Sequence, residues 1–172
     1  MGAAPPPIYK ILILGAESSG KTSVLNYIIQ KRNQIPSPTF GHNKIFYDYN
    51  NVRFEFWDVG GSKQNTFNWQ QYYQNSSAII FVVDASNLFD SKMDESKQCF
   101  KQVVENTNEK SKIIVFANKQ DLPQAMNTSE IYELLDLSNV SNRDVKIFES
   151  STKNQKGMLA GIQYLYASVT NQ

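Results

Sequence analysis

The chain has 172 residues, of which 41% are hydrophobic and 19% charged, and its formal net charge is +1. This length and composition are typical of one globular domain with its own core, and the near-neutral charge argues against a nucleic-acid-binding protein. The single cysteine, Cys99, fits a reducing cytoplasmic compartment, and no apolar run approaches the roughly 18 residues that span a bilayer.

The first part of the chain predicts a strand, a turn and a helix. Residues 8–14 form a short apolar run, which predicts a strand buried on both faces. Residues 15–21 are predicted as a turn and residues 22–31 as a helix. The expected inner face of that helix carries Val24, Leu25, Ile28 and Ile29. Residues 35–40 contain two prolines and are predicted as a loop.

Further along, the strands are expected to build one sheet. Residues 44–49 and 52–57 predict a hairpin turning at Asn50 and Asn51, because Asn tolerates positive φ. Residues 78–84, 112–118 and 144–150 predict three more strands. Helices are expected over residues 91–106 and 129–135 and at the end of the chain. Their expected core residues are Met93, Cys99, Phe100, Val103 and Val104, and then Met158, Ile162, Leu165 and Val169.

This alternation predicts an α/β fold. We expect a six-stranded, mostly parallel sheet with one antiparallel edge strand and helices on both faces. A short proline-containing segment, residues 1–8, would precede a single domain over residues 9–172. Ligands of such sheets bind at the carboxyl ends of the strands.

A phosphate-binding loop follows the first predicted strand. The segment Gly15, Ala16, Glu17, Ser18, Ser19, Gly20, Lys21, Thr22 matches G-x-x-x-x-G-K-[ST], and Ser23 follows it. The glycines allow backbone N–H groups to point at phosphates, and the helix amino end adds partial positive charge. Lys21 would reach the β- and γ-phosphates, and the Thr22 hydroxyl would bind Mg²⁺. The strand and helix on either side support this interpretation.

A second motif selects the base. Asn118, Lys119 and Asp121 form N-K-x-D directly after a predicted strand. The Asp121 carboxylate can accept two hydrogen bonds from guanine, whereas adenine presents no such pair of donors, and the Lys119 stem can lie over the base. The pattern therefore predicts GTP or GDP as ligand, with Mg²⁺, and argues against an ATP-using enzyme.

Two further motifs carry a family resemblance. Trp57-Asp58-Val59-Gly60-Gly61 and Pro38-Thr39-Phe40-Gly41-His42-Asn43 resemble the W-D-[VI]-G-G and P-T-x-G-x-N patterns of Arf and Arf-like small GTPases, and the resemblance runs from about Tyr9 to about Val169. It implies that Thr39 binds Mg²⁺, that Asp58 holds Mg²⁺ through water, and that the Gly61 N–H senses the γ-phosphate. It also implies that Ser150, Ser151 and Thr152 form the third base-contacting loop, although a simple strand-ending turn would look the same.

The sequence departs from that family at the catalytic position. The family places a water-orienting Gln directly after W-D-V-G-G, and this chain has Ser62 there. We therefore expect a catalytic group of Lys21, Thr39, Gly61 and Ser62 with slow intrinsic hydrolysis, ~10²-fold below an equivalent with Gln.

The amino-terminal segment departs as well. Arf-type proteins begin with an amphipathic helix that often carries a lipid on Gly2, but here Pro5, Pro6 and Pro7 prevent a regular helix. Pro6 also stands where the myristoylation pattern has Ser or Thr. We therefore expect weak or absent contact with membranes. The expected location is the cytoplasm, and a ciliary or peripheral-membrane location stays open.

The resemblance also implies partner proteins. Proteins of this branch bind their effectors through three hydrophobic side chains. The matching positions here are His42, Trp57 and Tyr72, with His42 in place of an expected Phe. Trp57 could instead be core, and His42 a solvated loop residue. Exchange and activating proteins are further expected partners. Two functions stay open: a GTP-driven switch, or a hydrolysis-poor adaptor that holds its nucleotide permanently within a larger assembly.

Overall fold

The computed structural model describes residues 4–30 and 37–171. Gly2, the predicted end of the first helix at Lys31, and the start of the predicted loop at residues 35 and 36 lie outside these residues. Within the described ranges, none of the helices is both long and apolar enough to cross a bilayer.

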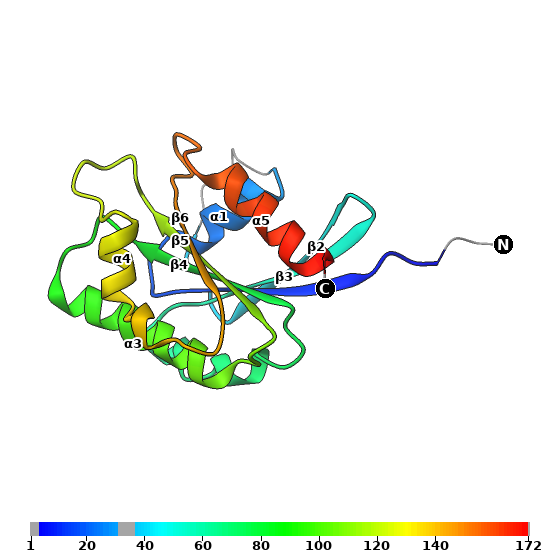
Figure 1. Ribbon diagram of the computed structural model, residues 1–172, viewed down its shortest axis with the longest axis horizontal. Coiled ribbons are helices and arrows are strands. Elements are labelled where there is room, and N and C mark those ends of the chain that lie inside the picture. Colours follow the sequence, from blue (N-terminus) through cyan, green and yellow to red (C-terminus); the bar gives the residue numbers. More distant parts are fainter. Residues whose placement is uncertain (1–3, 31–36, 172) are drawn as a thin grey trace.

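Six strands form one sheet, as predicted (Figure 1). They are β1 (Ile8–Leu14), β2 (His42–Tyr49), β3 (Val52–Val59), β4 (Ala78–Asp84), β5 (Lys112–Asn118) and β6 (Val145–Glu149). Their spatial order is β2-β3-β1-β4-β5-β6, and every neighbouring pair is parallel except β2 with β3. The single antiparallel strand therefore lies at one edge, and the other strands end together near the phosphate loop.

Helices cover both faces of this sheet, which also confirms the prediction (Figure 1). Along β1, Leu12 and Leu14 face one core cluster and Ile11 and Ile13 face the other, because side chains alternate along a strand. Helices α1 (Lys21–Ile28) and α5 (Met158–Thr170) pack on the Ile11 side. Helices α3 (Asp90–Asn106) and α4 (Thr128–Leu134) pack on the Leu12 side. Cys99 is buried there, and burial raises the pKa of its thiol to about 11.

The hairpin turns where the sequence predicts. Asn50 and Asn51 have φ values of 47° and 63°, as a tight turn with two left-handed residues requires. The strands extend beyond the predicted 44–49 and 52–57, because pairing continues to His42 opposite Val59. The hairpin thus carries the predicted effector residue His42 up to the nucleotide end of the sheet.

Helix boundaries differ from the prediction at several places. Helix α1 ends at Ile28, since Gln30 adopts a left-handed φ of 62°. Three short helices were not predicted: α2 (Lys63–Thr66), η1 (Trp69–Tyr72) and η2 (Leu137–Asn139). Helix α2 begins at a local cap, because the Ser62 hydroxyl accepts from the Asn65 N–H, whereas η1 begins at Trp69, which is fully buried and donates from its indole Nε1 to the Gly60 carbonyl at 3.0 Å.

A close contact in the core gives a test of this packing. Gly161 of α5 faces the buried ring of Phe116, and a Cβ added at Gly161 would lie 2.4 Å from two ring carbons. We expect Gly161→Ala to lower the free energy of unfolding by roughly 1–3 kcal/mol, because the ring must move within a packed core.

Urea unfolding measures this change. Helix propensity alone would make an internal Gly→Ala substitution stabilising by about 1 kcal/mol, so the sign of the effect is decisive. Gln163→Ala, at an exposed position of the same helix, is the control and should change stability by less than about 0.5 kcal/mol.

Candidate functional site

The phosphate loop connects β1 to α1 and is held by its two glycines. Gly15 and Gly20 have φ values of 148° and 101°, which side chains rarely adopt. A Cβ on Gly15 would lie 2.2 Å from the Val82 carbonyl oxygen, and one on Gly20 would lie 2.3 Å from Asn118 Nδ2. Glycine is thus required at both positions by conformation and by space. The loop packs against β4 on one side and the guanine motif on the other.

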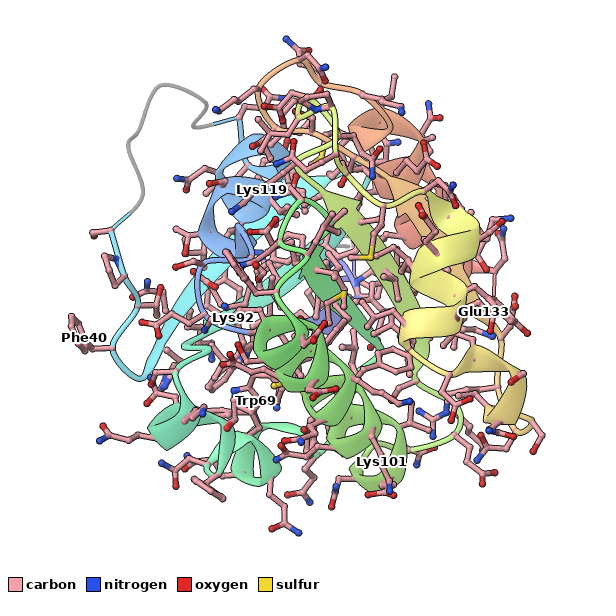
Figure 2. The ribbon with its side chains drawn as sticks, turned by 90° about the vertical axis from the view of Figure 1, so that its left-hand side faces the viewer. Phe40, Trp69, Lys92, Lys101, Lys119 and Glu133 are labelled. Atoms are coloured by element: carbon pink, nitrogen blue, oxygen red, sulfur yellow. The ribbon has the colours of Figure 1, made fainter. Side chains whose placement is uncertain are left out.

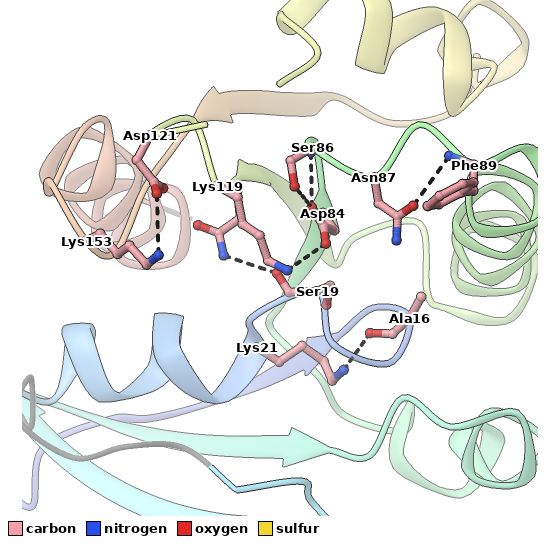
Figure 3. Close-up of polar contacts among 11 residues, drawn as sticks. Ala16, Ser19, Lys21, Asp84, Ser86, Asn87, Phe89, Lys119, Asp121 and Lys153 are labelled. Atoms are coloured by element: carbon pink, nitrogen blue, oxygen red, sulfur yellow. Dashed lines mark hydrogen bonds and ion pairs between the residues drawn. The ribbon is translucent and has the colours of Figure 1, made fainter. Parts of the chain in front are cut away.

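Lys21 points into this loop. Its side chain is buried, and its Nζ donates a 2.9 Å hydrogen bond to the Ala16 carbonyl (Figure 3). Burial lowers the pKa of Lys21, while the nearby Asp58 charge acts in the opposite direction. A Cβ on Gly61 would lie 2.4 Å from Lys21 Nζ. The structure therefore brings the predicted γ-phosphate sensor Gly61 against the phosphate-loop lysine.

Three oxygen atoms converge where the sequence predicts the metal. Thr22 Oγ1 donates to Asp58 Oδ2 at 2.6 Å, and Thr39 Oγ1 lies 3.3 Å from both of those atoms. Asp58 is fully buried, and burial raises the pKa of its carboxyl against the opposing effects of the Thr22 hydrogen bond and the Lys21 charge.

The donor set fits magnesium. Hydroxyl and carboxylate oxygens are the ligands that Mg²⁺ prefers, usually together with water and phosphate oxygens. Asp58 Oδ1 is buried and has no hydrogen-bond partner among the described residues, so a cation or its water would satisfy it. In the part of the chain that the structure describes, no cluster of three His, Cys, Asp or Glu side chains offers another metal site.

The guanine motif is attached directly to the phosphate loop. Asn118 Nδ2 donates to the Ser19 carbonyl at 3.1 Å. Lys119 has a left-handed φ of 69°, and its Nζ forms a 2.6 Å ion pair with Asp84 at the end of β4 (Figure 3). Sequence reasoning missed Asp84, although its place at the carboxyl end of a buried strand was a usable signal.

Asp121 is prepared as a hydrogen-bond acceptor. Ser151 Oγ donates to Asp121 Oδ1 at 2.7 Å, and this bond is the main reason that the pKa of Asp121 is lowered. Backbone bonds from Gln120 N to the Ser150 carbonyl and from Ser150 N to the Ala117 carbonyl join the two loops. Ser150 and Ser151 are fully buried and Thr152 is half-buried. The predicted base-contacting residues of the two loops thus lie side by side, with the Asp121 carboxylate held in place by Ser151.

A cavity of about 490 Å³ runs along the phosphate end of this site. Its lining comes from the phosphate loop and start of α1, from residues 37–40, from residues 60–62 with Asn65, and from Lys119. Ser62 is in this lining, but its hydroxyl also accepts from the Asn65 backbone N–H at 3.4 Å and begins α2. Asn65 was not predicted as a site residue, because only the fold of α2 brings it to the cavity.

The three predicted effector positions form an aromatic cluster. The His42 ring stacks on Trp57 with centroids 4.9 Å apart, and His42 Nδ1 lies 3.1 Å from the Tyr72 hydroxyl. Trp57 and Tyr72 are half-buried and their rings are 5.8 Å apart. Lys10 and Lys44 place their Nζ atoms 4.9 and 5.0 Å from the Trp57 ring. Trp57 also packs against the core cluster on the Leu12 side of the sheet. It therefore belongs both to the core and to this aromatic surface cluster.

Comparisons with known proteins agree with this geometry. The model of the ADP-ribosylation factor family matches residues 7–169. ADP-ribosylation factor 3 of Arabidopsis thaliana is 34% identical over 158 residues, which make up 91% of this chain and 85% of that protein. ADP-ribosylation factor 1 of Brassica rapa subsp. pekinensis gives the same identity and coverage.

A solved structure shares the fold. The Arl6 BBS3 small GTPase of Trypanosoma brucei, solved with the nucleotide analogue GppNp bound, matches with a TM-score of 0.87 at 27% identity. The match covers 96% of this chain and 99% of that chain. Since the family model spans residues 7–169 and both plant proteins match over most of their length, this chain belongs to the ADP-ribosylation factor family of small GTPases.

Proposed function

We propose that this protein is a guanine-nucleotide switch that requires Mg²⁺, hydrolyses GTP slowly and recruits effector proteins through His42, Trp57 and Tyr72. The observation that carries this proposal is the meeting of Thr22, Thr39 and Asp58 oxygens beside the phosphate loop. Such a meeting lets one bound metal and one phosphate hold residues 37–40 and 60–62 together, and lets hydrolysis release them.

The residues divide into clear roles. Lys21 and the loop N–H groups would bind the phosphates, and Gly61 would contact the γ-phosphate. Thr22 and Thr39 would hold Mg²⁺ directly and Asp58 through water, and the metal would neutralise phosphate charge. Asn118, Lys119, Asp121 and the loop at residues 150–152 would select guanine.

Partner proteins would bind the state in which the nucleotide orders residues 37–40 and 60–62. The His42, Trp57 and Tyr72 cluster lies beside the residues that the nucleotide would order, and Phe40, next to Thr39, is 91% exposed and points away from the body (Figure 2). Aromatic side chains of this kind are common anchors in protein interfaces. We propose a cytoplasmic site of action, with exchange and activating proteins as regulators.

A second function is favoured by Ser62. Its hydroxyl caps α2, and its short side chain carries no carboxamide to orient water. A protein that binds GTP tightly but rarely hydrolyses it would act as an adaptor within a larger assembly, whose nucleotide is structural. The two functions share the nucleotide site and differ in turnover.

Substitution of Ser62 therefore tests the rate of hydrolysis. We expect the purified wild type to turn over GTP slowly, and Ser62→Gln to raise the single-turnover hydrolysis rate by up to ~10²-fold, because the longer carboxamide can orient the attacking water. Ser62→Ala must not show the same gain, since it removes the cap without adding a carboxamide.

The nucleotide carried by the purified protein then separates the two functions. Bound GTP with very slow turnover would favour the adaptor. Bound GDP with an ordinary small-GTPase rate in the wild type would show that Ser62 does not limit hydrolysis, and the cycling switch would then be the better description.

Removal of the metal tests the proposed Mg²⁺ site. Chelation of Mg²⁺ with EDTA should speed release of a fluorescent GDP analogue at least ~10-fold from the wild type, because the metal stabilises only the bound state. Asp58→Asn should release the analogue quickly with or without EDTA. Asp48→Asn, on the exposed face of the hairpin, is the matched control and should keep the wild-type response. An unchanged EDTA response in Asp58→Asn would contradict the assigned metal site.

Substitution of Ser151 tests the base site. Ser151→Ala should weaken binding of the GDP analogue by about 5- to 10-fold, because a buried hydroxyl no longer orients the Asp121 carboxylate. Lys153→Ala is the control, since the Lys153 side chain is 79% exposed and its Nζ lies 3.8 Å from Asp121, and exposed pairs contribute little. Equal losses in both variants would overturn the role given to Ser151.

A further inference from the structure

The space over one face of Gly60 is bounded by two polar groups. A Cβ added at Gly60 would lie 2.4 Å from Asn65 Nδ2 and 2.6 Å from the Thr39 carbonyl oxygen. Both groups therefore approach the same side of the Gly60 Cα. Gly60, Thr39 and Asn65 all line the phosphate-end cavity, together with Lys21 and Gly61. The Asn65 carboxamide and the Thr39 carbonyl thus both lie next to Gly60, which precedes the proposed γ-phosphate contact Gly61.

The local fold explains why Asn65 reaches this place. Ser62 accepts the Asn65 backbone N–H with both its hydroxyl and its carbonyl, at 3.4 and 2.9 Å, and so begins α2. Residues three apart lie on one side of a helix, so this turn places the Asn65 side chain on the same side as Ser62. There it lies next to Gly60. The capping contact uses only the backbone of Asn65, which leaves its side chain available.

The Asn65 carboxamide is not committed elsewhere. It is half-buried, and among residues 4–30 and 37–171 it makes no side-chain hydrogen bond. A carboxamide carries one acceptor and two donors. The torsion that exchanges its oxygen and nitrogen is a broad one, and no hydrogen bond opposes that rotation. Either atom can therefore face the cavity.

We propose that Asn65 orients the attacking water in this protein, in the role that the missing Gln would have at Ser62. This inference rests on the proposed GTP hydrolysis. The water would donate one hydrogen bond to the Thr39 carbonyl oxygen and one to Asn65 Oδ1, which turns a lone pair of the water oxygen toward the γ-phosphorus. Asn65 takes up no proton and acts only by position.

The reaction it serves is balanced without a further reactant. The water oxygen forms a new bond to the γ-phosphorus as the bond from that phosphorus to the bridging oxygen breaks. The electron pair of the broken bond stays on the β-phosphate oxygen of GDP. Both water protons end on the released inorganic phosphate, one on the attacking oxygen and one on another oxygen of that phosphate. Neutral Asn65 and the Thr39 carbonyl leave the step unchanged.

Single-turnover hydrolysis of Mg²⁺–GTP by the full chain tests the proposal. We expect Asn65→Ala to lower the rate about 10-fold, with the release rate of a GTP analogue unchanged within twofold. Gln64→Ala removes a neighbouring carboxamide that is exposed, and it should keep the wild-type rate. The backbone cap of α2 is retained in both variants.

A double-mutant cycle together with the nucleotide release rate separates positioning from a structural role. In the Ser62→Gln background a second carboxamide is present and the Ser62 cap that places Asn65 is absent, so Asn65→Ala should cost less than twofold there. An equal loss in both backgrounds, or a loss accompanied by faster nucleotide release, would assign Asn65 a structural role and overturn the proposal.

The same assays distinguish a failure of the proposed function. If the wild type binds GTP but never hydrolyses it, the adaptor replaces the switch and Asn65 has no reaction to serve. If the wild type hydrolyses GTP and Asn65→Ala matches it, the switch stands and only the role of Asn65 is wrong.

Discussion

The hydrogen bond from Thr22 to the buried carboxylate of Asp58 joins the parts of the nucleotide site. The parallel pairing of β1 with β3 sets Ile13 beside Asp58, so the sheet brings this carboxylate to the phosphate loop. Thr39, in the segment at residues 37–40, reaches the same oxygen. Burial makes the charged carboxylate costly, and a bound cation would relieve that cost. In the proposed switch, phosphate binding, metal binding and the order of both flanking loops would be linked through this one side chain.

The residues proposed to select the base lie beside the phosphate loop. Asn118 donates to the Ser19 carbonyl of that loop, and Lys119 pairs with Asp84 at the end of β4, so the guanine motif supports the phosphate loop and is fixed to the sheet. Gly20 permits this contact, because any side chain there would strike Asn118. A substitution in either motif would therefore disturb the other, since they share a packed surface.

Replacement of the family Gln by Ser62 changes local structure as well as chemistry. A serine is a good helix cap, and here it begins a four-residue helix that brings Asn65 over Gly60. Ser62 thus takes away the carboxamide of the family Gln and, by capping α2, places the carboxamide of Asn65 near the site. The same segment leads into Trp69 and Tyr72, which tie it to Gly60 and to the aromatic cluster. The residues proposed for water positioning and part of the proposed effector surface thus lie on one short stretch of chain.

By itself the sequence determined the sheet, the hairpin turn at Asn50 and Asn51, the phosphate loop and the guanine motif. These depend on local patterns: apolar periodicity, positive φ and residue types at fixed spacing. Only the tertiary structure decided where α2 lies, that Ser151 anchors Asp121, that Asp84 pairs with Lys119, and that His42 stacks on Trp57. Each of these contacts joins segments whose separation in the sequence carries no periodic signal, and a four-residue helix is too short for propensity to indicate, so packing and hydrogen bonding between distant segments had to decide them.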